Sequence, residues 1–219
     1  MPTVVSVLNQ KGGSGKTTLA TNLAHGLQRR GLSVLVADAD PQGTASEWST
    51  LRPEDSNLPP VVGVKGSTIG DLDDVGAAYD VVVLDGAPAL DSPNVKALKT
   101  SDVVLLPIRP SGPDLWSVED LVDLIHTRRD VTDGRPLAAF VVSQQRRTNL
   151  AEGIADVLGD YGLPILSGRT SQRVAYAEAL TTGTTVLDAA PSSKAAAEIE
   201  EITDDVLALL EQATDSPNE

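Results

Sequence analysis

The chain of 219 residues carries 31 acidic residues against 17 lysines and arginines, which gives a formal net charge of −14, and it contains no cysteine. The absence of cysteine excludes disulfides, thiolate zinc sites and iron–sulfur clusters. A surface with this excess of negative charge repels DNA at long range, so any contact with DNA needs a local cluster of basic side chains. The sequence shows no signal peptide, lipidation motif or long apolar run, and we therefore expect a cytoplasmic protein.

Short apolar runs alternate with stretches of helical periodicity along the whole chain. Strands are predicted near residues 3–8, 33–37, 61–64, 80–84, 102–107, 137–142 and 164–166. Helices are predicted near residues 16–30, 44–51, 68–78, 92–99, 114–127, 149–161, 171–181 and 193–212. This alternation is typical of an α/β fold with a mostly parallel, twisted sheet and helices on both faces. The length suits a single domain with a two-sided core, which we place at residues 1–213, followed by a flexible tail at 214–219.

A glycine-rich loop follows the first predicted strand, where residues 9–18 read NQKGGSGKTT. Glycine lacks a Cβ atom and adopts positive φ at little cost, so such a loop can turn its backbone N–H groups toward a phosphate. The Lys16 ammonium can neutralise β- and γ-phosphates, the Thr17 hydroxyl can ligate Mg²⁺, and the next helix adds its dipole. The pattern predicts a P-loop NTPase whose triphosphate site consists of Lys11, Gly12, Gly13, Ser14, Gly15, Lys16, Thr17 and Thr18. A glycine-rich turn with two solvated lysines is the structural alternative.

The loop departs from the ordinary P-loop pattern, because Gln10 stands where that pattern has its first glycine and Lys11 follows it. With this second lysine, residues 11–17 resemble the deviant Walker A box of the ParA/MinD family of ATPases, and the chain is most similar to the short, ParF-like plasmid partition proteins. The resemblance implies that Lys11 reaches the nucleotide of a partner subunit, so that two ATP-loaded copies form a homodimer with both nucleotides between them. It also implies ATP and Mg²⁺ as cofactors.

Carboxylates follow two further predicted strands, with Asp38 and Asp40 after the second strand and Asp85 closing the fourth. Parallel sheets bind ligands at the carboxyl ends of their strands, and Asp85 has the form of a Walker B aspartate that holds Mg²⁺ through a water. The family resemblance implies a catalytic set of Lys11, Lys16 and Asp40, and a metal set of Thr17, Asp38 and Asp85. Within the catalytic set, the resemblance implies that Asp40 orients the attacking water. An aspartate after a strand also commonly caps a helix, and that interpretation of the pair stays open.

Two later segments resemble the same family. Residues 105–114, which read LLPIRPSGPD, match the strand-to-helix turn that borders the base and the dimer seam in short ParA proteins. Proline makes this turn stiff, and we predict that Pro107, Arg109 and Pro110 form a wall for the adenine, with a plain turn as the alternative. Residues 168–179 resemble the segment that closes over the nucleotide, and Arg173 within it is a candidate contact.

The resemblance implies a partition ATPase of the ParA type, an ATP-switched dimer that binds nonspecific DNA of the nucleoid and positions plasmid or chromosome cargo. Hydrolysis would be slow until a ParB-like centromere-binding protein or a cargo adaptor stimulates it, and the acidic surface suits a basic partner. DNA binding requires arginines or lysines that release phosphate counterions. The candidates in this chain are Arg146, Arg147, Arg169, Arg173 and Lys194.

Two alternatives share this core or this fold. A relative that positions a protein assembly, such as a microcompartment or a receptor cluster, would carry the same loop. A biosynthetic enzyme of the dethiobiotin or cobyrinate amidating type has the fold but lacks the lysine at position 11. Membrane binding of the MinD kind is not expected, because the last predicted helix carries acidic residues such as Glu200 and Asp204 where those relatives have a basic face.

Overall fold

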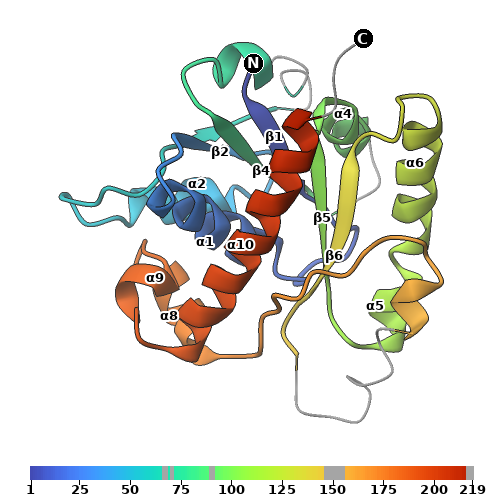
Figure 1. The fold of residues 1–219 in the computed structure, drawn as a ribbon. Helices are drawn as coiled ribbons and strands as arrows, with labels where there is room; N and C mark the ends of the chain where they lie inside the picture. The colour runs from blue at the N-terminus through green and yellow to red at the C-terminus, as the bar shows by residue number, and fades with distance from the viewer. Residues whose placement is uncertain (66–68, 70–71, 89–91, 146–155, 216–219) are drawn as a thin grey trace.

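In the part of the chain that the structure describes, six parallel strands form one central sheet (Figure 1). The computed structural model describes residues 1–219 except 66–68, 70–71, 89–91, 146–155 and 216–219. The strands are β1 (Thr3–Val7), β2 (Val34–Asp38), β3 (Val61–Gly63), β4 (Val81–Asp85), β5 (Val103–Ile108) and β6 (Leu137–Val142). They lie in the order β3-β2-β4-β1-β5-β6, and each neighbouring pair is parallel. The fold class predicted from the sequence is confirmed.

Helices connect the strands and follow the last one. They are α1 (Lys16–Arg29), α2 (Thr44–Thr50), α3 (Leu72–Val75), α4 (Ser92–Thr100), α5 (Gly112–Trp116), α6 (Glu119–Asp130), α8 (Val174–Thr181), α9 (Val186–Ala189) and α10 (Lys194–Asp215). Figure 1 shows α1 and α10 side by side, where they contact each other across one face of the sheet. The sheet is therefore the middle layer of three.

Every strand except the partly exposed edge strand β3 is buried on both faces, and the side chains of these strands alternate between two cores. Val5 and Val7 of β1 belong to the core that α1, α9 and α10 cover, whereas Val4 belongs to the core that α4 and α6 cover. Strands covered on both faces appear in a sequence as continuous apolar runs. This is why the strands could be found from the sequence without an alternating pattern.

Two predicted elements differ from the structure for local reasons. The helix predicted at 114–127 is two helices, because the chain turns between Trp116 and Glu119. The Ser117 hydroxyl donates to the Asp114 carbonyl at 2.8 Å, a side-chain bond that competes with the helical pattern. The strand predicted at 164–166 makes only an isolated bridge to Phe140, since a proline at 164 offers a carbonyl but no N–H.

Other differences concern helix ends and coverage. The last helix extends to Asp215, past its predicted end at 212, so the first two residues of the predicted tail are helical. The short helix α9 was not predicted. The helix predicted at 149–161 falls mostly outside the described residues, and its described part is helical at 156–159.

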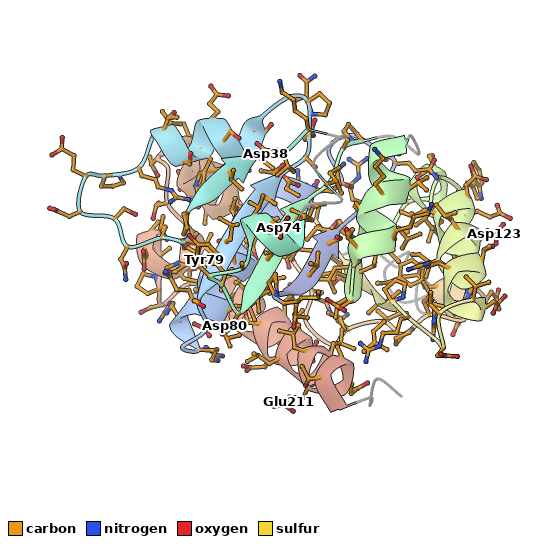
Figure 2. The ribbon with its side chains drawn as sticks, turned by 90° about the horizontal axis from the view of Figure 1, so that it is seen from above. Asp38, Asp74, Tyr79, Asp80, Asp123 and Glu211 are labelled. Carbon is orange, nitrogen blue, oxygen red and sulfur yellow. The ribbon has the colours of Figure 1, made fainter. Side chains whose placement is uncertain are left out.

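Many of the acidic side chains lie on the outside of the molecule. Figure 2 shows Asp123 of α6 and Glu211 of α10 at its rim, and both residues are exposed. Within the described ranges, none of the helices combines the length and the apolar character needed to span a bilayer.

Candidate nucleotide site

The glycine-rich loop lies at the carboxyl end of β1, between β4 and β5. The chain leaves β1 for β2 on one side and leaves β4 for β5 on the other, and such a switch point is where doubly wound sheets bind ligands. Gly13 and Gly15 adopt positive φ, 73° and 97°. α1 begins at Lys16, directly after these glycines. The loop therefore has the backbone of an anion-binding turn at a helix N-terminus.

Two side chains from the end of β6 hold this loop in place. The Ser143 hydroxyl donates to the Ser14 carbonyl at 2.8 Å, and Gln144 Nε2 donates to the Gly13 carbonyl at 2.8 Å. Gln144 itself has a positive φ of 50°, which is uncommon for a residue other than glycine. These bonds tie the glycine-rich loop to the end of β6.

Two buried carboxylates lie next to each other at the carboxyl ends of β2 and β4. Asp38 and Asp85 are register partners, with exposed fractions of 3% and 0%. Neither oxygen of Asp85 has a hydrogen-bond partner among the described residues. Burial raises the pKa of Asp85 to about 7; the Thr17 hydroxyl and the Lys16 ammonium oppose the rise, and the charge of Asp38 adds to it. A buried carboxylate without a well-formed hydrogen bond is costly unless a cation neutralises it, so these residues fit a divalent cation.

Asp38 and Asp40 also bind backbone groups near them. Asp38 Oδ2 accepts the Ser46 N–H at 2.8 Å and the Ser46 hydroxyl at 2.7 Å in the first turn of α2, and Figure 2 shows Asp38 beside this helix. Asp40 accepts the Gln42 N–H at 2.9 Å. The capping interpretation therefore describes Asp38, which also keeps its place beside Asp85, whereas the bond of Asp40 is to a backbone N–H that precedes α2.

A cavity of about 270 Å³ runs from the glycine loop to the Asp40 segment. Lys16 is buried, and its Nζ donates to the Lys11 carbonyl at 3.2 Å. Burial lowers the pKa of Lys16, and the charges of Asp85 and Asp40 oppose this. The cavity is lined by Gly12, Gly13, Gly15, Lys16, Thr17, Thr18, Asp40, Gln42, Thr44 and Pro88. It has the size, the cation and the backbone for a phosphate chain.

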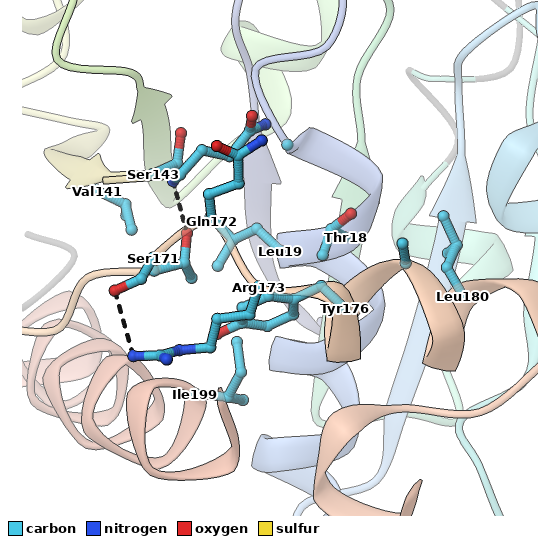
Figure 3. Close-up of a pocket in the computed structure, with 14 residues that line it drawn as sticks. Thr18, Leu19, Val141, Ser143, Ser171, Gln172, Arg173, Tyr176, Leu180 and Ile199 are labelled. Atoms are coloured by element: carbon cyan, nitrogen blue, oxygen red, sulfur yellow. Dashed lines mark hydrogen bonds between the residues drawn. The ribbon is translucent and has the colours of Figure 1, made fainter. Parts of the chain in front are cut away.

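A second cavity, of about 290 Å³, opens on the other side of Gly15 and Thr18, which line both cavities (Figure 3). Its walls come from α1, the end of β6, the segment before α8, α8 itself and α10. They combine apolar side chains with a few polar groups: Leu19, Val141, Leu180 and Ile199, together with Ser143, Gln144, Thr170 and Ser171. Such a lining is typical of a site for a flat organic ring.

Glu198 of α10 organises the outer wall of this second cavity. It accepts hydrogen bonds from the Ser171 N–H at 3.1 Å and hydroxyl at 2.7 Å, from Arg173 at 2.9 and 2.6 Å, and from the Tyr176 hydroxyl at 2.8 Å. Burial alone would raise the pKa of Glu198, but these donors outweigh it and lower the pKa. Figure 3 shows Arg173 and its hydrogen bond to Ser171. Sequence reasoning identified the segment 168–179 but missed Glu198, which lies 22 to 27 positions from these partners.

The three residues predicted to form a wall for the adenine do not line the cavities described above. Pro107, Arg109 and Pro110 line neither of the two cavities beside the glycine loop. Pro107 is buried within β5 opposite Val141, and Arg109 forms an ion pair with Asp114 at 3.0 Å. Contact of these three residues with the base stays a prediction, and the cavity beside α8 is the better fit to a base.

Lys11 is bound within its own subunit. Its Nζ lies 2.9 Å from Asp114 Oδ2, and its N–H donates to Asn9 Oδ1 at 2.8 Å. Asn9 in turn donates to the Pro107 carbonyl at 2.7 Å. The backbone of Lys11 is therefore tied to β5, while its side chain remains about one-third exposed, at 32%.

The predicted DNA contacts fall into three groups. Arg146 and Arg147 lie outside the described residues. Arg169 and Lys194 are exposed, as a DNA contact requires. Arg173 is paired with Glu198 at 2.6 Å beside the second cavity, so its guanidinium already has a partner.

Known proteins resemble this chain over nearly its whole length. The model of the CobQ/CobB/MinD/ParA nucleotide binding domain matches residues 5–186. The maintenance of carboxysome distribution protein A of Halothiobacillus neapolitanus is 31% identical over 208 residues, covering 93% of this chain and 95% of the relative. The chromosome-partitioning ATPase Soj of Thermus thermophilus is 29% identical over 246 residues, covering 95% and 97%.

A solved structure of similar shape is the septum site-determining protein MinD of Pyrococcus horikoshii complexed with Mg-ADP. It matches with a TM-score of 0.76 and 18% identity, covering 97% of this chain and 99% of that one, which supports the fold. The glycine loop, the buried aspartates and these matches lead to one assignment. The chain belongs to the CobQ/CobB/MinD/ParA family of nucleotide-binding proteins, the family of the P-loop ATPases ParA and MinD.

Proposed function

We propose that the protein is a ParA-type ATPase that binds ATP with Mg²⁺, dimerises around the nucleotides and hydrolyses ATP to position a cargo. The observation that carries the proposal is the pair of cavities that meet at Gly15 and Thr18. The first cavity contains the Lys16 ammonium and the glycine backbone that phosphates need, and the second cavity has the mixed apolar and polar lining that a base needs. A single nucleotide fits across both.

The described residues suggest a division of roles. Lys16 binds the β- and γ-phosphates, and Asp40 orients the attacking water. Thr17 and Asp85 would hold Mg²⁺, with Asp38 beside them. When bound, Mg²⁺ neutralises charge on the phosphate oxygens, the main need of phosphoryl transfer. Hydrolysis is slow in the single subunit, because part of the site comes from the second copy.

Lys11 supplies that missing part. We expect the protein to form dimers with Mg²⁺ and a non-hydrolysable ATP analogue, as measured by light scattering. Lys11→Ala should remain a monomer under the same conditions while it still binds the nucleotide. Lys194→Ala, which removes an exposed lysine of α10, is the matched control and should dimerise normally. A Lys11→Ala protein that dimerises like the wild type would refute the role of Lys11 at the partner's nucleotide.

Two kinds of cargo are compatible with this switch. The similarity to Soj favours DNA, and the similarity to the carboxysome distribution protein favours a protein assembly. In both cases the ATP-bound dimer would bind nonspecific DNA in the nucleoid, and a basic partner protein would stimulate hydrolysis. An adaptor that binds a centromere sequence indicates partition, whereas an adaptor that binds a protein shell indicates compartment positioning.

Nonspecific DNA binding can be tested at the paired arginines. If Arg146 and Arg147 each contact a phosphate, a dimer of the Arg146→Ala, Arg147→Ala variant loses four contacts. The log–log salt dependence of binding to a random-sequence duplex should then become shallower by about 4. The salt dependence of the variant and of the wild type is compared with ATP bound. The control is Arg128→Ala, which removes one of two adjacent arginines in the last turn of α6. Unchanged salt dependence would exclude these two arginines from the DNA contact.

The family also includes the CobQ and CobB proteins, so a biosynthetic activity is the second candidate. It predicts that ATP turnover depends on a small-molecule carboxylate. ATP hydrolysis by the purified protein without any metabolite, and its stimulation by a protein partner, would favour the positioning ATPase.

A further inference from the structure

One buried carboxylate binds both basic residues that the sequence assigned to the dimer seam. Asp114 of α5 has a side chain only 3% exposed. Its Oδ2 lies 2.9 Å from Lys11 Nζ and also accepts the Ser111 hydroxyl, and its Oδ1 lies 3.0 Å from Arg109. We call these four residues the Asp114 cluster. In this state the ammonium of Lys11 serves a carboxylate of its own subunit.

We propose that Asp114 is a positioning residue that stores Lys11 in the single subunit and gives it up when a second ATP-loaded copy docks. The proposal rests on the proposed function, in which Lys11 binds the partner's nucleotide. It adds a competitor for that lysine, so the stability of the dimer depends on how firmly Asp114 holds Lys11.

The cluster is built so that Lys11 can leave at low cost. Removing the only partner of a buried charge is strongly destabilising, because the remaining charge is left uncompensated. Asp114 keeps a donor on each oxygen after Lys11 departs, Arg109 on Oδ1 and Ser111 on Oδ2. Lys11 in turn gains a triphosphate, whose charge exceeds that of one carboxylate.

The move requires the side chain of Lys11 alone. Its backbone N–H stays bound to Asn9, which is anchored to β5 through the Pro107 carbonyl. Four flexible side-chain bonds separate the ammonium from this fixed backbone, and the side chain is already 32% exposed. The glycine loop therefore keeps its shape around its own nucleotide while Lys11 changes partner.

The exposed face next to the cluster supports a second copy as the docking partner. Trp116, two residues after Asp114 in α5, is 74% exposed, whereas Trp48 is 1% exposed. A large aromatic residue so close to Lys11 would be covered when a second copy docks over the glycine loop. Because these are the two tryptophans of the chain, a blue shift of tryptophan emission on docking reports on Trp116.

The test measures the dimer dissociation constant with Mg²⁺ and a non-hydrolysable ATP analogue, by light scattering and by tryptophan emission. Asp114→Asn removes the charge that competes for Lys11, and it should tighten the dimer about 5-fold. Arg109→Gln leaves Lys11 as the main cation on Asp114, and it should weaken the dimer by a similar factor. The two changes act through one carboxylate, so Arg109→Gln should have no further effect in the Asp114→Asn background.

The outcomes separate this inference from the proposed function. If Lys11→Ala abolishes dimerisation and Asp114→Asn tightens the dimer only when Lys11 is present, the storage role holds. A folded Asp114→Asn protein with an unchanged or weaker dimer overturns it, as does tightening that persists in the Lys11→Ala background. Should Lys11→Ala itself dimerise normally, the proposed function fails at its first step. Thermal unfolding of each variant tests whether it is folded. If Asp114→Asn is not folded, the dimer dissociation constant of Arg109→Gln decides the question.

Discussion

The buried Asp85 makes the nucleotide-free protein sensitive to pH, and the substitution Asp85→Asn should remove that sensitivity. The carboxyl group has a pKa of about 7 in the folded protein against an ordinary value of 3.8. At about 1.36 kcal/mol for each pKa unit, the ionised carboxylate costs about 4 kcal/mol of folding free energy above neutral pH.

The sign follows from where the proton is bound. Between the two pKa values only the folded state holds the proton, so the free energy of unfolding falls as the pH rises through this range. Asparagine has no such proton, so the Asp85→Asn variant should be the more stable protein. The difference in the free energy of unfolding between the variant and the wild type should increase by about 3 kcal/mol between about pH 5 and about pH 8.

The assay is urea unfolding of both proteins in EDTA without nucleotide, at several pH values. Asp123→Asn, which neutralises an exposed carboxylate of α6 (Figure 2), is the control and should leave the pH dependence unchanged. With Mg²⁺ and ADP present, the wild type should instead be more stable than Asp85→Asn, because the ligand stabilises only the protein that binds it well. A constant difference between Asp85→Asn and the wild type at all pH values would refute the reasoning.

Two further substitutions test the base cavity and the fold. Glu198→Ala removes the acceptor that holds Ser171, Arg173 and Tyr176, and it should raise the dissociation constant of a fluorescent ATP analogue about 10-fold. The dissociation constant of Glu198→Gln should lie between those of the wild type and Glu198→Ala. The control is Glu201→Ala, which changes an exposed residue of the same helix. Equal affinity of all four proteins would exclude a role of Glu198. Gly183→Ala should lower the free energy of unfolding by about 3 kcal/mol or more, because φ is +66° and the new Cβ would lie 2.3 Å from the backbone of Leu51. Gly134→Ala, with φ +82° and nothing within 4 Å, isolates the backbone cost alone, and similar losses for both would contradict the clash.

The sequence allowed the sheet and the phosphate end of the site to be predicted, because both are local signals. The runs that form β1 and β4 are mostly apolar, and ten consecutive residues contain the whole glycine loop. Lys16, Thr17 and Asp40 were predicted to belong together, and the structure places them around one cavity.

The base end could not be predicted in the same way. Its lining joins Gly15, Val141, Thr170 and Ile199, which come from distant parts of the chain and meet only in the folded protein. The partner of Lys11 was also hidden, since Asp114 lies 103 positions away. An aspartate after a proline is an ordinary helix-start residue, and nothing in its local sequence marks it as the holder of two cations.

The two residues at the end of β6 carry a consequence for how this protein can evolve. Ser143 and Gln144 brace the phosphate loop through the Ser14 and Gly13 carbonyls, and they also line the cavity assigned to the base. Under the proposed function, a change at either position alters the fit of the base and the shape of the phosphate loop at once. Selection for a new nucleotide preference would therefore have more freedom on α8, from which Tyr176, Ala177 and Leu180 line the second cavity.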